Sequence, residues 1–148
     1  MDAIEMIKQD HRRIEELFDK FFETESETTQ ENLFQQIESG LTAHSDMEEQ
    51  VLYERVKTFA KDEVEKALKE HMQVKELLGD LLDMDINEEG FESRFNLLQE
   101  DVLNHVQEEE GSGGLLEIVR QHFDENELNE MAAQMREIQK STEEDLAA

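Results

Sequence analysis

Residues 4–21, IEMIKQDHRRIEELFDKF, decide the fold class, because their apolar side chains recur at steps of three or four. That spacing places them on one face of an α-helix. Three later stretches repeat the rhythm, and each forms a narrow seam of the kind that packs helices into bundles. The seam positions are Ile4, Ile7, His11, Ile14, Phe18 and Phe21; Ile37, Leu41, His44, Glu48 and Val51; Val64, Ala67, His71, Val74, Leu78 and Leu81; and Phe91, Phe95, Leu98, Val102, His105 and Glu109.

The stretches between the seams are short and polar. Short connections make neighbouring helices run antiparallel. No segment shows the alternation of a β-strand. The sequence therefore predicts an all-α protein built as an up-down-up-down four-helix bundle. The three connections are residues 23–30, 57–63 and 83–90.

The last third of the chain adds helix to this bundle. The glycine-rich stretch 111–114 ends the fourth helix. Residues 115–123 and 125–140 have helical periodicity, and the second of these stretches carries an apolar stripe that can lie against the bundle. We expect one domain over residues 1–140 with an additional C-terminal helix, followed by a frayed tail at 141–148.

The composition excludes several classes of protein. The 148 residues include 40 acidic and 14 basic side chains, so the net charge is −26. Such a chain repels the phosphates of nucleic acids and of anionic membranes, so neither is an expected partner. Cys is absent, which excludes disulfides, thiolate metal sites and iron–sulfur clusters. The start lacks a signal-peptide layout and no apolar run reaches about 20 residues, so we expect a soluble, cytoplasmic protein.

Six polar residues occupy seam positions that call for apolar side chains. Two residues on antiparallel helices lie at the same depth when the turn is midway between them, and the midpoints of these residues fall inside the three connections. All six side chains should therefore meet inside the bundle. Buried carboxylates without a partner are costly, no seam Lys or Arg stands at that depth, and a divalent metal would remove the cost. The six residues are His11, His44, Glu48, His71, His105 and Glu109.

The chain also looks like two copies of one helical hairpin. Residues 9–17 match residues 69–77, and His44 and Glu48 recur 61 positions later as His105 and Glu109. Each half then supplies one lone histidine and one His-x-x-x-Glu pair, whose members share a helix face. That set is enough for two metal ions, with the glutamates able to bridge them.

The donor set narrows the choice of metal. Imidazole and carboxylate without sulfur suit iron, manganese or zinc. The His-Glu-x-x-His pattern of zinc proteases and the Glu-x-x-His pattern of ferritin-like bundles are both absent.

The motifs around the six residues resemble those of the hemerythrin-like (HHE cation-binding) family, over about residues 3 to 122. The resemblance implies a four-helix bundle that holds an oxo- or hydroxo-bridged pair of iron ions, with manganese or zinc as substitutes. It also implies four terminal histidine ligands, His11, His44, His71 and His105, and two bridging carboxylates, Glu48 and Glu109. The matching motifs are Gln9-Asp10-His11, His44-x-x-x-Glu48-Glu49-x-Val51-Leu52-Tyr53, Glu70-His71 and His105-Val106-Gln107-Glu108-Glu109-Glu110-Gly111.

Two departures from the oxygen-carrying members bear on function. Lys75 stands where they have a second histidine on the third helix, and Glu109 follows His105 by four positions where they have an aspartate at five. One imidazole fewer leaves more positions open, so we expect binding of O2, peroxide or NO. A di-iron oxidoreductase that reduces peroxide or NO, an iron-donating or iron-sensing protein, and a scaffold without redox role stay open as alternatives.

Two further residues have open roles. His122 follows the glycine stretch and is either a surface residue or a fifth metal-binding nitrogen. Tyr53 lies five positions after Glu48 and is either a hydrogen-bond or radical partner of the site or a packing residue.

Overall fold

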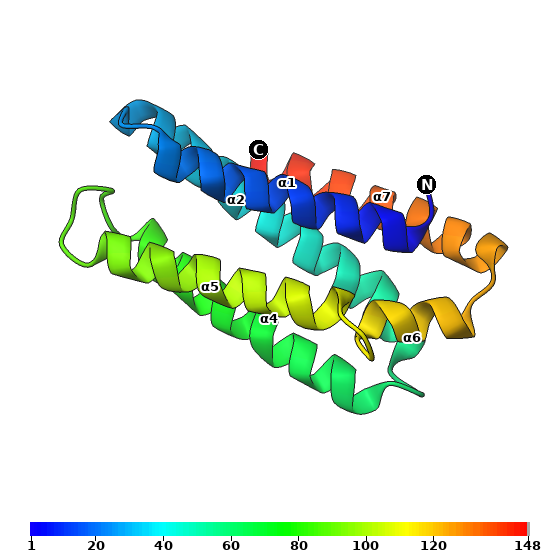
Figure 1. Cartoon of the computed structure of the whole chain (residues 1–148). Helices are drawn as coiled ribbons and strands as arrows, with labels where there is room; N and C mark the ends of the chain where they lie inside the picture. The colour runs from blue at the N-terminus through cyan, green and yellow to red at the C-terminus, as the bar shows by residue number, and fades with distance from the viewer. Residues whose placement is uncertain (148) are drawn as a thin grey trace.

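Four long helices form the body of the molecule, whose computed structural model describes residues 1–147 (Figure 1). Neighbouring helices run antiparallel, and no strand occurs in the described part of the chain. This architecture confirms the predicted all-α bundle. The four helices are α1 (Ala3–Glu23), α2 (Glu27–Met47), α4 (Lys61–Leu82) and α5 (Phe91–Glu110).

Local sequence signals set where these helices begin. At the start of α1, the Asp2 carboxylate accepts from the Glu5 amide at 2.9 Å and the Glu5 carboxylate accepts from the Asp2 amide at 3.2 Å. Ser26 caps α2 by accepting from the Thr29 amide at 3.3 Å. Gly90 precedes α5 with φ of 93°, a left-handed conformation that favours glycine.

The second long helix does not end at Met47. It widens into a π-helical turn, η1 (Glu48–Leu52), and continues as α3 (Tyr53–Val56). The Tyr53 amide donates to the Glu48 carbonyl, five residues back, where an α-helix would use the carbonyl four residues back. Turns of this kind are rare and are frequent at functional sites. The heptad-like rhythm of the sequence predicts a regular helix here and does not indicate the extra residue.

The apolar core is divided into two clusters by the polar layer of the bundle. One cluster surrounds η1, α3 and the C-terminal helices, and the other fills the opposite end with aromatic side chains. Phe18, Phe21 and Phe95 belong to this second cluster, and the rings of Phe21 and Phe95 lie 4.2 Å apart. The two clusters hold the intervening polar residues in fixed positions from both sides.

The C-terminal segment forms α6 (Leu115–His122) and α7 (Glu125–Ala147). Helix α7 lies along α1, α2 and η1 (Figure 1). Its Leu128, Met131 and Met135 are buried in the apolar cluster that these elements share. The structure continues α7 past the expected end at residue 140, since Thr142 donates to Asp46 at 3.0 Å and ties this part of the helix to α2. Residue 148, the end of the expected tail, lies outside the described residues. No helix within residues 1–147 is long and apolar enough to cross a membrane.

Candidate metal centre

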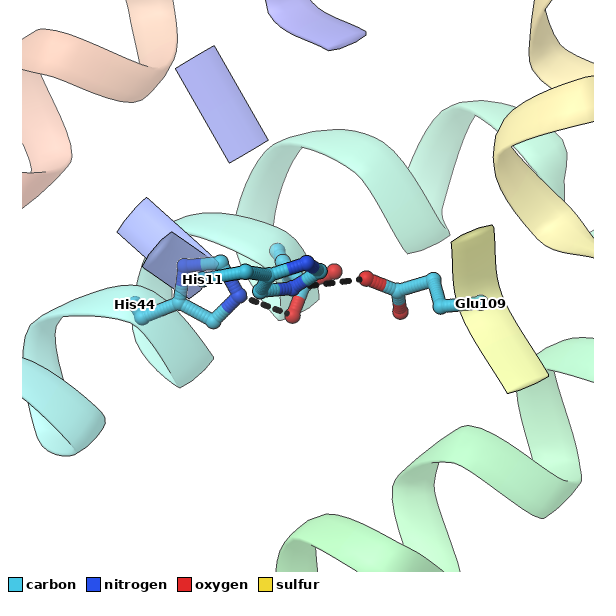
Figure 2. Close-up of side chains that lie close together, drawn as sticks. His11, His44 and Glu109 are labelled. Carbon is cyan, nitrogen blue, oxygen red and sulfur yellow. Dashed lines mark ion pairs between the residues drawn. The ribbon is translucent and has the colours of Figure 1, made fainter. Parts of the chain in front are cut away.

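The six polar seam residues meet between the two apolar clusters. All of them are buried, and their donor atoms fall into two groups, each within 4.8 Å of one another. Figure 2 shows His11, His44 and Glu109 converging from three different helices. The groups share Glu48 and consist of His11, His44, Glu48 and Glu109, and of Glu48, His71 and His105.

Both glutamates lie between the pair His11 and His44 and the pair His71 and His105. The Glu48 Oε1 atom is 2.9 Å from His44 Nε2 and 3.5 Å from His71 Nε2. The Glu109 carboxylate is 3.3 Å from His11 Nε2 through Oε1 and 3.2 Å from His105 Nε2 through Oε2. Each carboxylate therefore contacts one histidine from each half of the chain, as bridging groups would.

The two histidine pairs have nearly the same geometry. The rings of His11 and His44 are 4.8 Å apart at 61°, and those of His71 and His105 are 4.8 Å apart at 65°. This agreement supports the internal repeat that the sequence indicates.

A carboxylate contacts the Nδ1 atom of each of the four histidines. The distances are 2.5 Å for His11 to Glu110, 3.0 Å for His44 to Asp10, 3.0 Å for His71 to Glu49 and 2.8 Å for His105 to Glu70. A carboxylate on Nδ1 fixes the ring and leaves Nε2 free to bind a metal ion. All four Nε2 atoms accordingly point into the cluster, where they contact the glutamates.

Sequence reasoning missed these four carboxylates, although a signal was present. Each one is the chain neighbour of a cluster residue: Asp10 of His11, Glu49 of Glu48, Glu70 of His71 and Glu110 of Glu109. Successive helical residues point about 100° apart, so each carboxylate reaches the histidine of an adjacent helix instead of its neighbour's own site. These pairs join residues on different helices, so they can be identified only once the packing of the helices is known.

Several inward-facing atoms lack a hydrogen-bond partner among the described residues. These atoms lie near one another, and the pair of His44 Nε2 and Glu48 Oε1 is close at 2.9 Å without hydrogen-bond geometry. Buried polar atoms without partners are rare and call for an explanation such as a missing ion. The five atoms are His11 Nε2, His44 Nε2, both carboxylate oxygens of Glu48 and Glu109 Oε1. A metal ion fits this donor set.

Protons compensate the cluster's charge when no metal is bound. Burial lowers the pKa of His44, but the charge of Glu48 and the contact with Asp10 outweigh it and raise the pKa to about 10. Burial likewise lowers the pKa of His105, while Glu109 and two further carboxylates raise it to about 12. Burial raises the pKa of Glu48, yet the neighbouring histidines hold it well below its usual range. Metal ligands must be deprotonated, so metal binding would release these protons.

Tyr53 closes one side of the cluster. Its hydroxyl donates to Glu109 Oε2 at 3.1 Å and lies 3.3 Å from His71 Nε2. Burial, reinforced by the Glu109 and Glu48 carboxylates, raises the pKa of Tyr53 well above its ordinary value, so the phenol stays protonated. Of the two roles that the sequence left open, the geometry favours a hydrogen-bond partner of the site.

A small cavity of about 20 Å³ lies on the opposite side of the cluster. It is large enough for roughly one water-sized molecule. The four histidines form its polar wall, and the apolar wall belongs to the phenylalanine-rich cluster. The apolar residues are Ile14, Leu41, Val74, Val102 and Val106.

His122 lies outside the cluster. It is exposed on α6, its Nδ1 atom donates to the Ile118 carbonyl at 2.9 Å, and its ring stacks on Phe59 at 4.1 Å. The structure thus places it on the surface and not among the candidate ligands.

Comparisons with known proteins agree with this geometry. The family model of the hemerythrin HHE cation binding domain matches residues 2–112. The crystal structure of a hemerythrin HHE cation binding domain-containing protein from Mycobacterium kansasii matches with a TM-score of 0.79 and 27% identity, over 95% of this chain and 89% of that one. A protein of Nostoc sp. named DNA nickase is 26% identical over 137 residues, which are 92% of this chain. The chain spans 38% of the length of that relative.

Proposed function

The chain belongs to the hemerythrin HHE cation-binding domain family, and we propose that its six-residue cluster holds two metal ions, with iron as the native metal. The observation that carries this proposal is the set of four histidines whose Nδ1 atoms contact carboxylates while their Nε2 atoms face two shared glutamates. Nitrogen and oxygen donors without sulfur suit iron, and also manganese or zinc as substitutes.

The repeat supports a division of the ligands between two ions. His11 and His44 would hold one ion, His71 and His105 would hold the other, and the two glutamates would be shared. Glu48 belongs to both groups of donor atoms, and Glu109 contacts His11 and His105, which supports a bridging role for each. Two negative charges at this position also offset the charge of the ions.

We propose that the centre binds a small molecule of the size of O2, NO or peroxide. A pair of iron ions would supply electrons and open coordination positions for such a molecule. The 20 Å³ cavity supports this function because it joins the four imidazoles to an apolar wall and is large enough for only about one water-sized molecule. The apolar wall favours neutral molecules and excludes bulk water.

Metal analysis combined with an optical spectrum tests the proposal. The purified chain, loaded with ferrous iron without oxygen, should contain about two ions per chain and should change its visible spectrum when air replaces nitrogen. A reversible change indicates a carrier or sensor. A chain that retains no iron after desalting, or whose loaded spectrum is the same under both gases, contradicts the proposal.

A second candidate function is an oxidoreductase that reduces peroxide or NO. Tyr53 favours it, because its buried hydroxyl donates to Glu109 at 3.1 Å and lies 3.3 Å from His71, so the site has a fixed polar group beside the centre. Catalytic loss of peroxide or NO with a supplied reductant, slowed in Tyr53→Phe, distinguishes this function from simple binding.

We do not propose for this chain the DNA nickase activity that the Nostoc relative is named for. This chain covers 38% of that protein. The present chain has 40 acidic and only 14 basic residues, and this excess of negative charge disfavours contact with DNA phosphates. We therefore propose a small-molecule ligand and no nucleic-acid partner.

A further inference from the structure

A surface pocket of about 330 Å³ leads to one side of the six-residue cluster. Helices α4 and α5 and the glycine loop 111–114 form its walls, and His105 and Glu109 lie among its lining residues. The neighbouring pockets beside Arg12 and Arg13 contain none of the six cluster residues. This pocket therefore joins the buried site to the surface.

The pocket exists because α5 ends at Glu110, whereas its counterpart in the first half, α2, continues through η1 into α3. In the internal repeat, Glu109 is the equivalent of Glu48, 61 positions later. By the same interval, Gly114 is the equivalent of Tyr53. Tyr53 is 2% exposed and fills its end of the bundle, whereas Gly114 has no side chain. A Cβ atom on Gly114 would lie 2.8 Å from the Glu109 carbonyl, so the loop is held against the end of α5 and cannot carry a filling side chain there.

The lining of the pocket is acidic. Glu63, Glu70 and Glu108 stand along it, and Glu109 is its buried member, 4% exposed, with an Oε1 atom that has no hydrogen-bond partner among the described residues. One lysine faces them, since Lys66 on α4 reaches across to Glu108 on α5 at 3.1 Å. Both side chains of this pair are exposed, so the pair is weak and easily opened.

We propose that this pocket is the path by which divalent metal ions reach the cluster, with the Lys66–Glu108 pair across its mouth. The inference rests on the proposed metal centre. A row of carboxylates that ends in a buried, unpartnered carboxylate oxygen attracts a cation and offers it successive oxygen ligands. A neutral molecule gains nothing from such a lining, and the apolar cavity shares only His105 with this pocket.

Charge variants of the mouth test the path through the rate of metal uptake. The metal-free full chain is mixed with Co²⁺ at low ionic strength, and the visible absorption of the bound ion is followed by stopped flow. Lys66→Gln should raise the uptake rate about two- to fivefold, and Glu108→Gln combined with Glu63→Gln should lower it by a similar factor. The final amount of bound Co²⁺ should not change, and about 0.5 M salt should suppress both effects.

The exposed pair Lys57 and Glu54, at 2.7 Å, provides matched controls away from the pocket. Lys57→Gln changes the net charge by −1, as Lys66→Gln does, and Glu54→Gln changes it by +1, as Glu108→Gln alone does. Equal rates for Lys66→Gln and Lys57→Gln would overturn the path. An effect of the mouth variants that persists at high salt would also overturn it. A wild-type chain that binds no Co²⁺ and no Fe²⁺ would instead overturn the metal centre itself.

Discussion

The two halves of the molecule present the same ligands but finish differently. In the first half, the helix that carries His44 and Glu48 continues through η1 and turns Tyr53 into the site. In the second half, the helix that carries His105 and Glu109 stops at Glu110 and leaves a pocket. The ring geometry of the histidine pairs is the same within a few degrees. The repeat thus preserves the donor set, while the residues just beyond each His-x-x-x-Glu pair differ. Tyr53 fills the space after the first pair, and a surface pocket opens after the second.

Removing one histidine from each half gives the largest expected effect and tests whether the halves are equivalent. His11→Ala and His71→Ala should each lower bound iron from about two ions per chain to about one, because each removes a terminal donor of a different ion. Metal analysis after desalting measures this content. His122→Ala is the control and should keep the wild-type amount, since its ring stacks on Phe59 outside the cluster. Unchanged iron in either cluster variant would remove that histidine from the ligand set.

Metal removal should expose the proton compensation that both halves share. The pKa of His44 is about 10 and that of His105 about 12 in the folded chain, against 6.5 as the ordinary value. Their stabilisation is complete below about pH 6.5 and is lost as the pH rises toward 10 for His44 and toward 12 for His105, so the melting temperature of the metal-free chain should fall over that range.

The loaded chain should not follow this fall, because its ligating imidazoles are already neutral. It should also be more stable by about 3 kcal/mol when free metal exceeds Kd a hundredfold. Thermal unfolding of both forms at several pH values measures the difference. Equal melting temperatures with and without metal at neutral pH would contradict this account.

The carboxylates on Nδ1 offer a finer comparison of the halves. Asp10→Asn and Glu70→Gln remove matched partners of His44 and His105, and each should weaken metal affinity about 10- to 100-fold. Asp10 is buried and also accepts from Gln139 of α7, whereas the Glu70 side chain is 22% exposed, so the Asp10 variant should lose more. Competition with a chromophoric chelator measures both affinities. A larger loss of metal affinity in Glu70→Gln than in Asp10→Asn would mean that the burial of Asp10 beside α7 does not strengthen metal binding.

Tyr53→Phe should have the smallest effect on the folded chain. It removes one hydrogen bond to Glu109, which costs about 1 kcal/mol, and it leaves all six ligands in place. Bound iron should stay at the wild-type amount while the optical response to air or peroxide changes. An identical response in the variant would reduce Tyr53 to a packing residue.

The bundle and the convergence of the six residues were predictable, because both depend on periodicity and on the lengths of three connections. His11 and His105 come together from opposite ends of the chain, and the midpoint argument is sufficient to place them at one depth. The wide turn at Glu48 was not predictable, since the sequence EEQVL carries no mark of it and its contacts with α7 form only in the folded chain. The identity of the bound metal likewise remains a prediction, because iron, manganese and zinc accept the same donors.

The turn η1 also links Glu48 to Tyr53 through the backbone. Its wide hydrogen bond runs from the Tyr53 amide to the Glu48 carbonyl, so the backbone of the phenol is attached directly to a residue shared by both donor groups. A metal ion bound by Glu48 would replace its contacts with protonated histidines, and any shift of the Glu48 backbone would reach Tyr53 through this hydrogen bond. Glu109, which lines the open pocket, accepts from the hydroxyl of the same residue at 3.1 Å. Tyr53 is therefore attached to both shared glutamates, to Glu48 through its backbone and to Glu109 through its side chain.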